Sequence, residues 1–303
     1  MSLPPGYLSY PHRRHGMDQD RYPWRLSIDR PPIAWPGDKA IALLIVAPIE
    51  HHMLNPGGKP FKHPGAMQTP YPDLRHYTTR DYGNRVGVFR LLKELKAAGL
   101  KATVPINGAA LGRFGPLIRA LEADGHEIAA YGWDTDSIHW AGMEIDQERS
   151  LVAKTRAGFD SHGLRPTTWL SPARQQSFST LDLIAEQGFT VCLDWEMDQV
   201  PVPVRTDQGR LTCVPLSNEL DDRKLLIDQR QTEAEWRDQI LEAAACLKAE
   251  YARFGGQVLS FTLTPYVSGQ PFRIWAVREA LRALAADPAV WSASAADIIE
   301  ACA

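Results

Sequence analysis

Segments with the pattern of a buried strand alternate with helical segments along most of this chain, and this alternation constrains the fold more than any other feature. Residues 40–49 form an unbroken apolar run, which is typical of a strand covered on both faces. Further strands are expected at 102–106, 127–130, 168–170, 190–193, 258–263 and 291–292, and helices at 85–99, 116–123, 147–161, 179–187, 232–254, 273–286 and 295–302. Alternation of this kind predicts an α/β protein with a parallel sheet, closed or nearly closed into a barrel of seven or eight strands.

The first 38 residues show neither pattern and are rich in Pro, Arg, Tyr and His. We therefore expect residues 1–38 to form an irregular arm and residues 39–303 to form a single barrel domain. Trp24 and Trp35 lie on the arm, and because indole rings are costly to leave in water, the arm should pack on the body or on a neighbouring subunit. A Pro- and Gly-rich loop is expected at 55–81 and is long enough to be functional.

The composition excludes several classes of partner. Lys and Arg number 33 and Asp and Glu 36, so the net charge of −3 leaves no basic footprint for nucleic acid or an anionic membrane. The longest apolar run is far shorter than the ~20 residues that span a bilayer. The first residues lack a basic stretch followed by an apolar core, so we expect no signal peptide and a cytoplasmic location. The four cysteines lie far apart, which excludes a CxxC metal or redox motif.

The carboxyl ends of the expected strands carry most of the chemistry-bearing residues, and these ends form the active face of a (β/α) barrel. They are Glu50–His52, Asn107 with Gly108, Tyr131–Asp136, Ser171–Arg174, Asp194 with Trp195, and Thr264–Tyr266.

Five stretches carry a resemblance to a known family. Residues 85–92 (RVGVFRLL), 100–108 (LKATVPING) and 125–133 (GHEIAAYGW) resemble the polysaccharide deacetylase (NodB-homology, carbohydrate esterase family 4) family. Residues 82–87 (YGNRVG) and 265–273 (PYVSGQPFR) are similar to its subgroup of metal-independent allantoinase and cyclic-imide hydrolase. The resemblance covers about residues 20–300 and implies a distorted (β/α) barrel that hydrolyses a carbonyl–nitrogen bond.

The resemblance also implies where a metal would bind, and this chain departs from that pattern. The family places a general base and a ligand acid after the first strand, where Glu50 and His51 stand here. Two ligand histidines four residues apart are replaced by Tyr131 and Thr135, and a third histidine by Thr264. Because a catalytic zinc usually takes three protein ligands, we expect no metal or other cofactor. His51, and His52 or His139 by insertion, are the residues left as alternative ligands.

The rest of the pattern suggests three catalytic residues. Glu50 would act as general base. Arg174, with backbone N–H groups of the Ser171 loop and a neutral Tyr131, would stabilise the oxyanion, and Asp194 would orient Arg174. The expected substrate-binding residues are His51, Asn107, Tyr131, Trp133, Trp169, Ser171, Thr264 and Tyr266.

Each assignment has a structural alternative. Arg174 with Asp194 could be an ion pair that only closes the barrel top, and Tyr131, Trp133 and Trp169 could be core aromatics. We interpret the acidic residues Glu219, Asp221 and Asp222 as a solvated loop. A carboxylate kept at the barrel mouth for function would cost stability, so Glu50→Gln should leave stability unchanged or raised.

The sequence thus predicts a metal-independent hydrolase of a small cyclic amide, imide, ureide or lactone. Without a metal to polarise the carbonyl, the substrate must be electrophilic or strained. A lyase or isomerase could use the same Glu50, and a catalytically dead barrel that binds a metabolite or a protein is the alternative from another class. The expected partners are a small-molecule substrate and other copies of the chain, as a dimer or tetramer. Neither nucleic acid nor membrane is expected.

The replaced histidines generate a prediction about metal content. We expect purified protein to carry substoichiometric divalent metal and its activity to be insensitive to chelators, because Tyr131 and Thr135 are poor ligands. Elemental analysis before and after chelation measures this. One tightly bound zinc or manganese per chain, with activity abolished by chelation, would contradict it.

Overall fold

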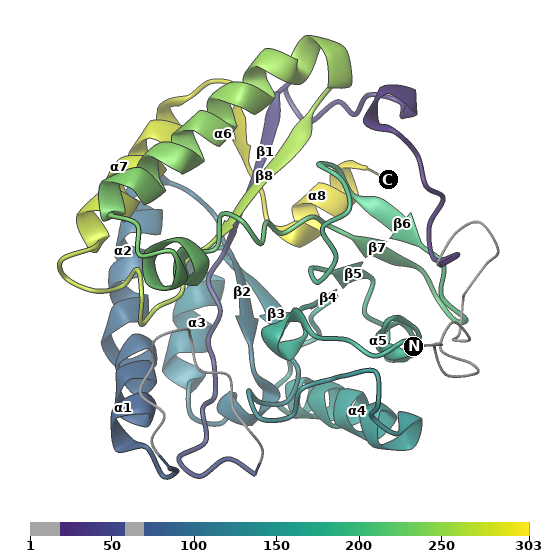
Figure 1. Cartoon of the computed structure of the whole chain (residues 1–303), viewed down its shortest axis with the longest axis vertical. Coiled ribbons are helices and arrows are strands. Elements are labelled where there is room, and N and C mark those ends of the chain that lie inside the picture. The colour runs from purple at the N-terminus through teal and green to yellow at the C-terminus, as the bar shows by residue number, and fades with distance from the viewer. Residues whose placement is uncertain (1–18, 58–69, 303) are drawn as a thin grey trace, which may run out of the picture.

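The computed structural model describes residues 19–57 and 70–302, which fold around one curled sheet (Figure 1). Nine strands of this part of the chain form the sheet in the order β6-β7-β5-β4-β3-β2-β1-β8, with β9 paired to β1. Their bounds are β1 Ile41–Val46, β2 Thr103–Ile106, β3 Glu127–Ala130, β4 Thr168–Trp169, β5 Val191–Cys192, β6 Val202–Val204, β7 Leu211–Cys213, β8 Gln257–Thr262 and β9 Val290–Ser292. The expected α/β barrel is confirmed in distorted form, because the ladder leaves β6 and β8 at its two ends.

The strand count is higher than expected because of one hairpin. β6 and β7 pair antiparallel, whereas the other pairs are parallel. β6 contains Pro203 and is flanked by Pro201, and proline is confined to sheet edges because it has no N–H to donate. Short strands with proline lack the apolar signal by which the others are recognised in the sequence.

Helices surround the sheet. They are α1 Leu74–Tyr82, α2 Val88–Ala98, α3 Gly115–Ala123, α4 Ile145–Ser161, α5 Thr180–Glu186, α6 Glu233–Phe254, α7 Ile274–Ala286 and α8 Ala295–Ala301. The long helix α6 begins at a capping box in which Thr232 and Glu235 satisfy each other's backbone N–H groups, and α2 ends at Gly99 with φ 66°. Within the described residues, no helix combines the length and apolar character needed to cross a bilayer.

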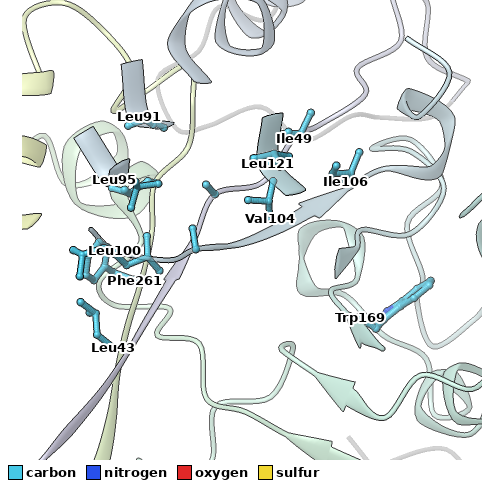
Figure 2. Close-up of a cluster of buried hydrophobic side chains, with 14 of the residues drawn as sticks. Leu43, Ile49, Leu91, Leu95, Leu100, Val104, Ile106, Leu121, Trp169 and Phe261 are labelled. Atoms are coloured by element: carbon cyan, nitrogen blue, oxygen red, sulfur yellow. The ribbon is translucent and has the colours of Figure 1, made fainter. Parts of the chain in front are cut away.

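The alternation of side chains along β1 builds two apolar cores. Leu43 and Ile45 face outward to a cluster that includes Leu91, Leu95 and Phe261, between the sheet and its helices (Figure 2). The other face of β1, which carries Ala42, Leu44 and Val46, belongs to an inner cluster with Ile298 of α8 and Tyr131. Full burial of such a side chain contributes roughly 1.5–3 kcal/mol, so both faces of β1 anchor the fold. The inner cluster leads directly to the carboxyl end of β1, where Glu50 lies.

The described part of the arm packs on the body at some positions only. Trp35 is 2% exposed and its Nε1 donates to Gln257 O at 3.1 Å, as expected for a buried indole. Arg21 anchors the arm by a paired hydrogen bond to Asp182 at 2.5 and 2.7 Å. Trp24 is 71% exposed, so the expectation that it packs on its own chain is wrong. Oligomerisation stays a prediction.

A helix begins inside the segment expected to be a loop. Asp73 caps α1 by accepting from His76 N, and α1 continues through a π-helical turn at Gly83–Gly87 into α2. The prediction that this helix begins at residue 85 was wrong, because Gly83 and Gly87 obscure the helical pattern in the sequence. These glycines do not end the helix. A Cβ atom on Gly87 would overlap Pro265 O, and one on Gly83 would crowd the backbone of Tyr266, so glycine is needed for close packing of two segments.

This close approach generates a prediction about stability. We expect Gly87→Ala to lower the free energy of unfolding by at least about 2 kcal/mol, because the methyl group must push the 265–269 segment away. Gly115→Ala is the matched control, since a Cβ there meets only Arg119 Nη1 at 3.6 Å in the first turn of α3. Urea unfolding measures both. Equal stability of the two variants would show that the 83–87 and 265–269 segments are not tightly packed.

Candidate active site

Glu50 lies just beyond β1, at the centre of a buried network of polar side chains. It is 5% exposed. Its Oε1 accepts from Arg223 Nη1 at 3.2 Å and from the Tyr131 hydroxyl at 3.3 Å, and its Oε2 lies 3.1 Å from His52 Nε2. The network joins the ends of β1 and β3 to the segment after β7.

The groups around Glu50 decide its ionisation. Burial by itself would raise the pKa of Glu50, but the Arg223 guanidinium, His52 and Arg80 outweigh it and lower the pKa to about 2. The carboxyl group is therefore ionised at neutral pH. Burial and the charge of Glu50 raise the pKa of Tyr131, so its hydroxyl stays protonated and can act as a hydrogen-bond donor.

Arg223 is the main residue of this network that the sequence did not reveal. It lies in a π-helical turn, Arg223–Asp228, and a second π-helical turn, Gly83–Gly87, supplies Asn84, whose Nδ2 donates to Glu50 O at 2.7 Å. Single π-helical turns often occur at functional sites. The only sequence signal was the charge-rich stretch 219–224, which we interpreted as solvated.

Two adjoining cavities open beside Glu50. The smaller, of about 40 Å³, is lined by Glu50, His52, Arg80, Tyr131, Thr135, Ile138, Ala173, Arg223 and Tyr266. The larger, of about 240 Å³, shares Tyr131, Ala173 and Arg223 with the first. Its other lining residues are Pro48, Leu170, Arg174, Leu216, Asn218, Asp221, Lys224, Asp228 and Thr262. A carboxylate facing a chamber of water-molecule size beside a larger cavity is a suitable arrangement for binding water next to a small ligand.

Arg174 lines the larger cavity, but Asp194 does not orient it. Arg174 Nη1 donates to Leu216 O at 2.8 Å and to Asn218 Oδ1 at 2.6 Å. Asp194 instead accepts from Ser171 N and Oγ, both at 2.7 Å, and from Gln176. The predicted pairing is therefore wrong, because the carboxylate is used to fix the loop after β4.

That loop is held in an unusual conformation. Ala173 and Arg174 have φ values of 55° and 53°, a region that costs energy for residues with a side chain. Ser171 N donates a hydrogen bond to Asp194. This N–H is therefore not free to stabilise an oxyanion, contrary to our expectation from the sequence. The strained turn directs Arg174 to the larger cavity.

Of the three acidic residues interpreted as a solvated loop, Glu219 is 72% exposed, as expected, but Asp221 and Asp222 are not. Asp222 is fully buried and accepts from Thr264 N at 2.6 Å and from the Ser268 hydroxyl. Burial and the neighbouring Asp221 raise the pKa of Asp222 to about 7. Asp221 lies 3.8 Å from Arg223 and 3.9 Å from Arg174. The solvated interpretation is wrong for both, because the chain folds this segment over the barrel mouth.

The predicted substrate-binding residues fall into two groups. Tyr131 and Tyr266 line the small cavity, and the Arg80 guanidinium lies over the Tyr266 ring at 5.1 Å. His51 lies beside a void of about 10 Å³ on the other side of Glu50. The remaining five, Asn107, Trp133, Trp169, Ser171 and Thr264, do not line either cavity.

These five residues hold the scaffold instead. Asn107 Oδ1 accepts a hydrogen bond from His51 N at 2.7 Å, and Asn107 Nδ2 donates one to Tyr131 O. Trp169 packs on Phe189 in the core, and Trp133 covers Gly108 beneath Lys154. The Ser171 hydroxyl donates a hydrogen bond to Asp194, and Thr264 N donates one to Asp222. For Trp169 the structural alternative is correct, because this side chain is fully buried in the core, whereas Trp133 is half-buried and packs on Gly108 and Gly158.

The residues at the metal-ligand positions of the family pattern do not fit a divalent cation. Thr135 Oγ1 donates to His51 O at 2.9 Å, and the Tyr131 hydroxyl is protonated. Arg223 and Arg80 place positive charge beside Glu50, which disfavours a second cation there. His52 is bonded to Glu50, and His139 is 1% exposed and paired with Glu148 in the core. Among the described residues, no three His, Cys, Asp or Glu side chains are placed to share a metal.

Comparison with known proteins supports the resemblance to one family. The family model for polysaccharide deacetylases matches residues 70–192. A crystal structure of a "probable polysaccharide deacetylase" from Pseudomonas aeruginosa PAO1 has 25% identity and a TM-score of 0.77, over 90% of this chain and 94% of that one. Over residues 70–192 this chain therefore resembles the polysaccharide deacetylase family, and it shares the fold of this solved structure.

A second solved structure has a similar fold. The PuuE allantoinase has 24% identity and a TM-score of 0.77, over 91% of this chain and 96% of that one. No protein of curated function matches the sequence. Members of the polysaccharide deacetylase family are hydrolases that act on C–N or ester bonds.

The Glu50–Arg223 pair generates a prediction that reverses our sequence-based expectation for stability. Glu50→Gln leaves Arg223 without its closest carboxylate, so we expect a loss of about 3 kcal/mol in the free energy of unfolding at pH 7. Because the folded-state pKa of about 2 lies below the ordinary 4.5, this contribution is present above pH 4.5 and is lost as the pH falls towards 2. Denaturant unfolding at pH 7 and pH 3 measures it.

Two further variants make this measurement specific. Glu122→Gln, on the exposed side of α3, should change stability little at either pH. In the Glu50→Gln, Arg223→Gln double variant the two losses should be less than additive, since both remove the same pair. If the two losses in the free energy of unfolding are additive, or if Glu50→Gln is as stable as the wild type at pH 7, the Glu50–Arg223 ion pair does not stabilise the fold.

Proposed function

We propose that this protein hydrolyses a C–N or ester bond in a small cyclic amide, imide, ureide or lactone, without a metal ion. One observation carries the proposal: the ionised Glu50 faces a chamber of water-molecule size, with His52, Arg223 and Tyr131 around it, next to a cavity of about 240 Å³. The likeness to the fold of an allantoinase, which acts on a cyclic ureide, agrees with this substrate class.

The proton transfers are assigned to Glu50 and His52 together. Water in the small chamber gives one proton to this pair as its oxygen attacks the carbonyl carbon. The pair returns the proton to the leaving nitrogen or oxygen as the C–N or C–O bond breaks. With a pKa of about 2, Glu50 alone is a weak base, so the hydrogen bond of 3.1 Å to His52 Nε2 matters, because a ring nitrogen of the imidazole can take up the proton for the pair.

The developing oxyanion is assigned to Arg223 and Tyr131. Both groups line the two cavities where these adjoin, and the Tyr131 hydroxyl, which donates to Glu50 in the free site, can turn to the oxyanion once the carboxylate has taken up the proton. Arg223 is charged and the Tyr131 hydroxyl is neutral, so together they can replace the Lewis acid that a metal would supply. Preorganised donors of this kind are typically worth about 10²–10³ in rate each.

The substrate must suit a site without a strong Lewis acid. An unactivated N-acetyl amide is a poor substrate for such a site, whereas ring strain or a second carbonyl on the same nitrogen makes the carbon more electrophilic. The cavity size also favours a small ring over a polymer segment.

The experiment is a panel of cyclic imides, ureides and lactones, with ring opening followed in the presence of a chelator. For the member that reacts, we expect Glu50→Gln to lower kcat by about 10²–10⁴ and His52→Gln by a smaller factor, with Glu122→Gln as control. Undiminished turnover in Glu50→Gln would remove Glu50 from the mechanism. Failure of the whole panel, together with tight binding of one of its members, would favour the metabolite-binding alternative.

A further inference from the structure

The charges that line the two cavities do not balance. Four cationic side chains, Arg80, Arg174, Arg223 and Lys224, face three carboxylates, Glu50, Asp221 and Asp228. Buried charges are normally paired, so a surplus of positive charge around partly buried cavities is unusual. The surplus increases further whenever Glu50 accepts a proton.

Arg174 carries a large part of this surplus. Its side chain is 15% exposed. It donates to the carbonyl oxygens of Leu216 and Ser217, to Asn218 Oδ1 and to Thr262 Oγ1, which are all neutral acceptors. The Asp221 carboxylate lies 3.9 Å away.

Asp221 is itself shared between several groups. Its Oδ1 accepts from Arg223 N at 2.8 Å and from Lys224 N at 3.4 Å, and the Arg223 guanidinium lies 3.8 Å from it. One carboxylate therefore serves two guanidinium groups and two backbone N–H groups, so it compensates Arg174 only in part.

Lys224 adds a charge that is easily redirected. It lines the larger cavity and its ammonium contacts Glu219, whose side chain is 72% exposed. Exposed ion pairs contribute little, about 0–1 kcal/mol, so a ligand in the cavity can compete with Glu219 for this ammonium.

We propose that the substrate of this site carries an anionic group, a carboxylate, which binds between Arg174 and Lys224 in the larger cavity. The inference rests on the proposed hydrolase function and specifies its substrate class. Arg174 and Lys224 line only the larger cavity, whereas Arg223 lines both, so the carboxylate and the scissile carbonyl would occupy opposite ends of the ligand. A planar guanidinium and a mobile ammonium are both well suited to a carboxylate.

The test uses ring pairs that differ only in a carboxylate: dihydrouracil against dihydroorotate, and hydantoin against hydantoin-5-acetate. Calorimetry on the full chain measures affinity, and ring opening is followed separately. We expect each carboxylate member to bind at least roughly tenfold more tightly than its neutral partner, the factor expected from one charge-assisted hydrogen bond. The preference should weaken with added salt.

Lys224→Gln should reduce this preference several-fold, and Lys224→Glu should abolish it. Lys93→Gln, an exposed charge on α2, is the control and should leave the preference unchanged. Equal affinity within both pairs, tighter binding of the neutral members, or no binding of any of the four probes would overturn the inference. Ring opening of neutral members at equal affinity would overturn it while leaving the proposed hydrolase function intact.

Discussion

The site of this protein depends on one buried ion pair, between Glu50 at the end of β1 and Arg223 in the π-helical turn that follows β7. A carboxylate that is only 5% exposed would be costly to ionise alone. Arg223, His52 and Arg80 offset this cost so completely that the carboxyl is a stronger acid than one in water. The same contact ties the first strand of the sheet to a segment more than 170 residues later in the chain.

Close backbone packing also shapes the surroundings of Glu50. Gly83 and Gly87 let the helix formed by α1, its π-helical turn and α2 approach the segment after β8, which brings Asn84 and Tyr266 close to Glu50. The strained turn at Ala173 and Arg174 closes the opposite side. Glycines and left-handed residues therefore serve the site as directly as its charged side chains do.

The residues that the family resemblance assigns to the metal position make other contacts in this structure. Where the family pattern has ligand histidines, this chain has Tyr131, which donates to Glu50, and Thr135, which fixes the His51 carbonyl. Guanidinium groups supply the positive charge nearby. Fixed cations and a neutral phenol can stabilise an oxyanion, but they polarise a carbonyl less than a metal does, which limits such a site to reactive substrates.

The sequence by itself determined the fold class, most helices and strands, and the place of Glu50, because apolar periodicity and strand ends are local properties of the chain. It also showed that the usual ligands are replaced. Only the tertiary structure decided the partners: that Arg223 pairs with Glu50, that Asp194 holds Ser171, that Asp222 is buried, and that Trp169 belongs to the core. A residue's type limits which interactions it can make, but its partner depends on which distant segments the sheet brings together, and no local pattern records that.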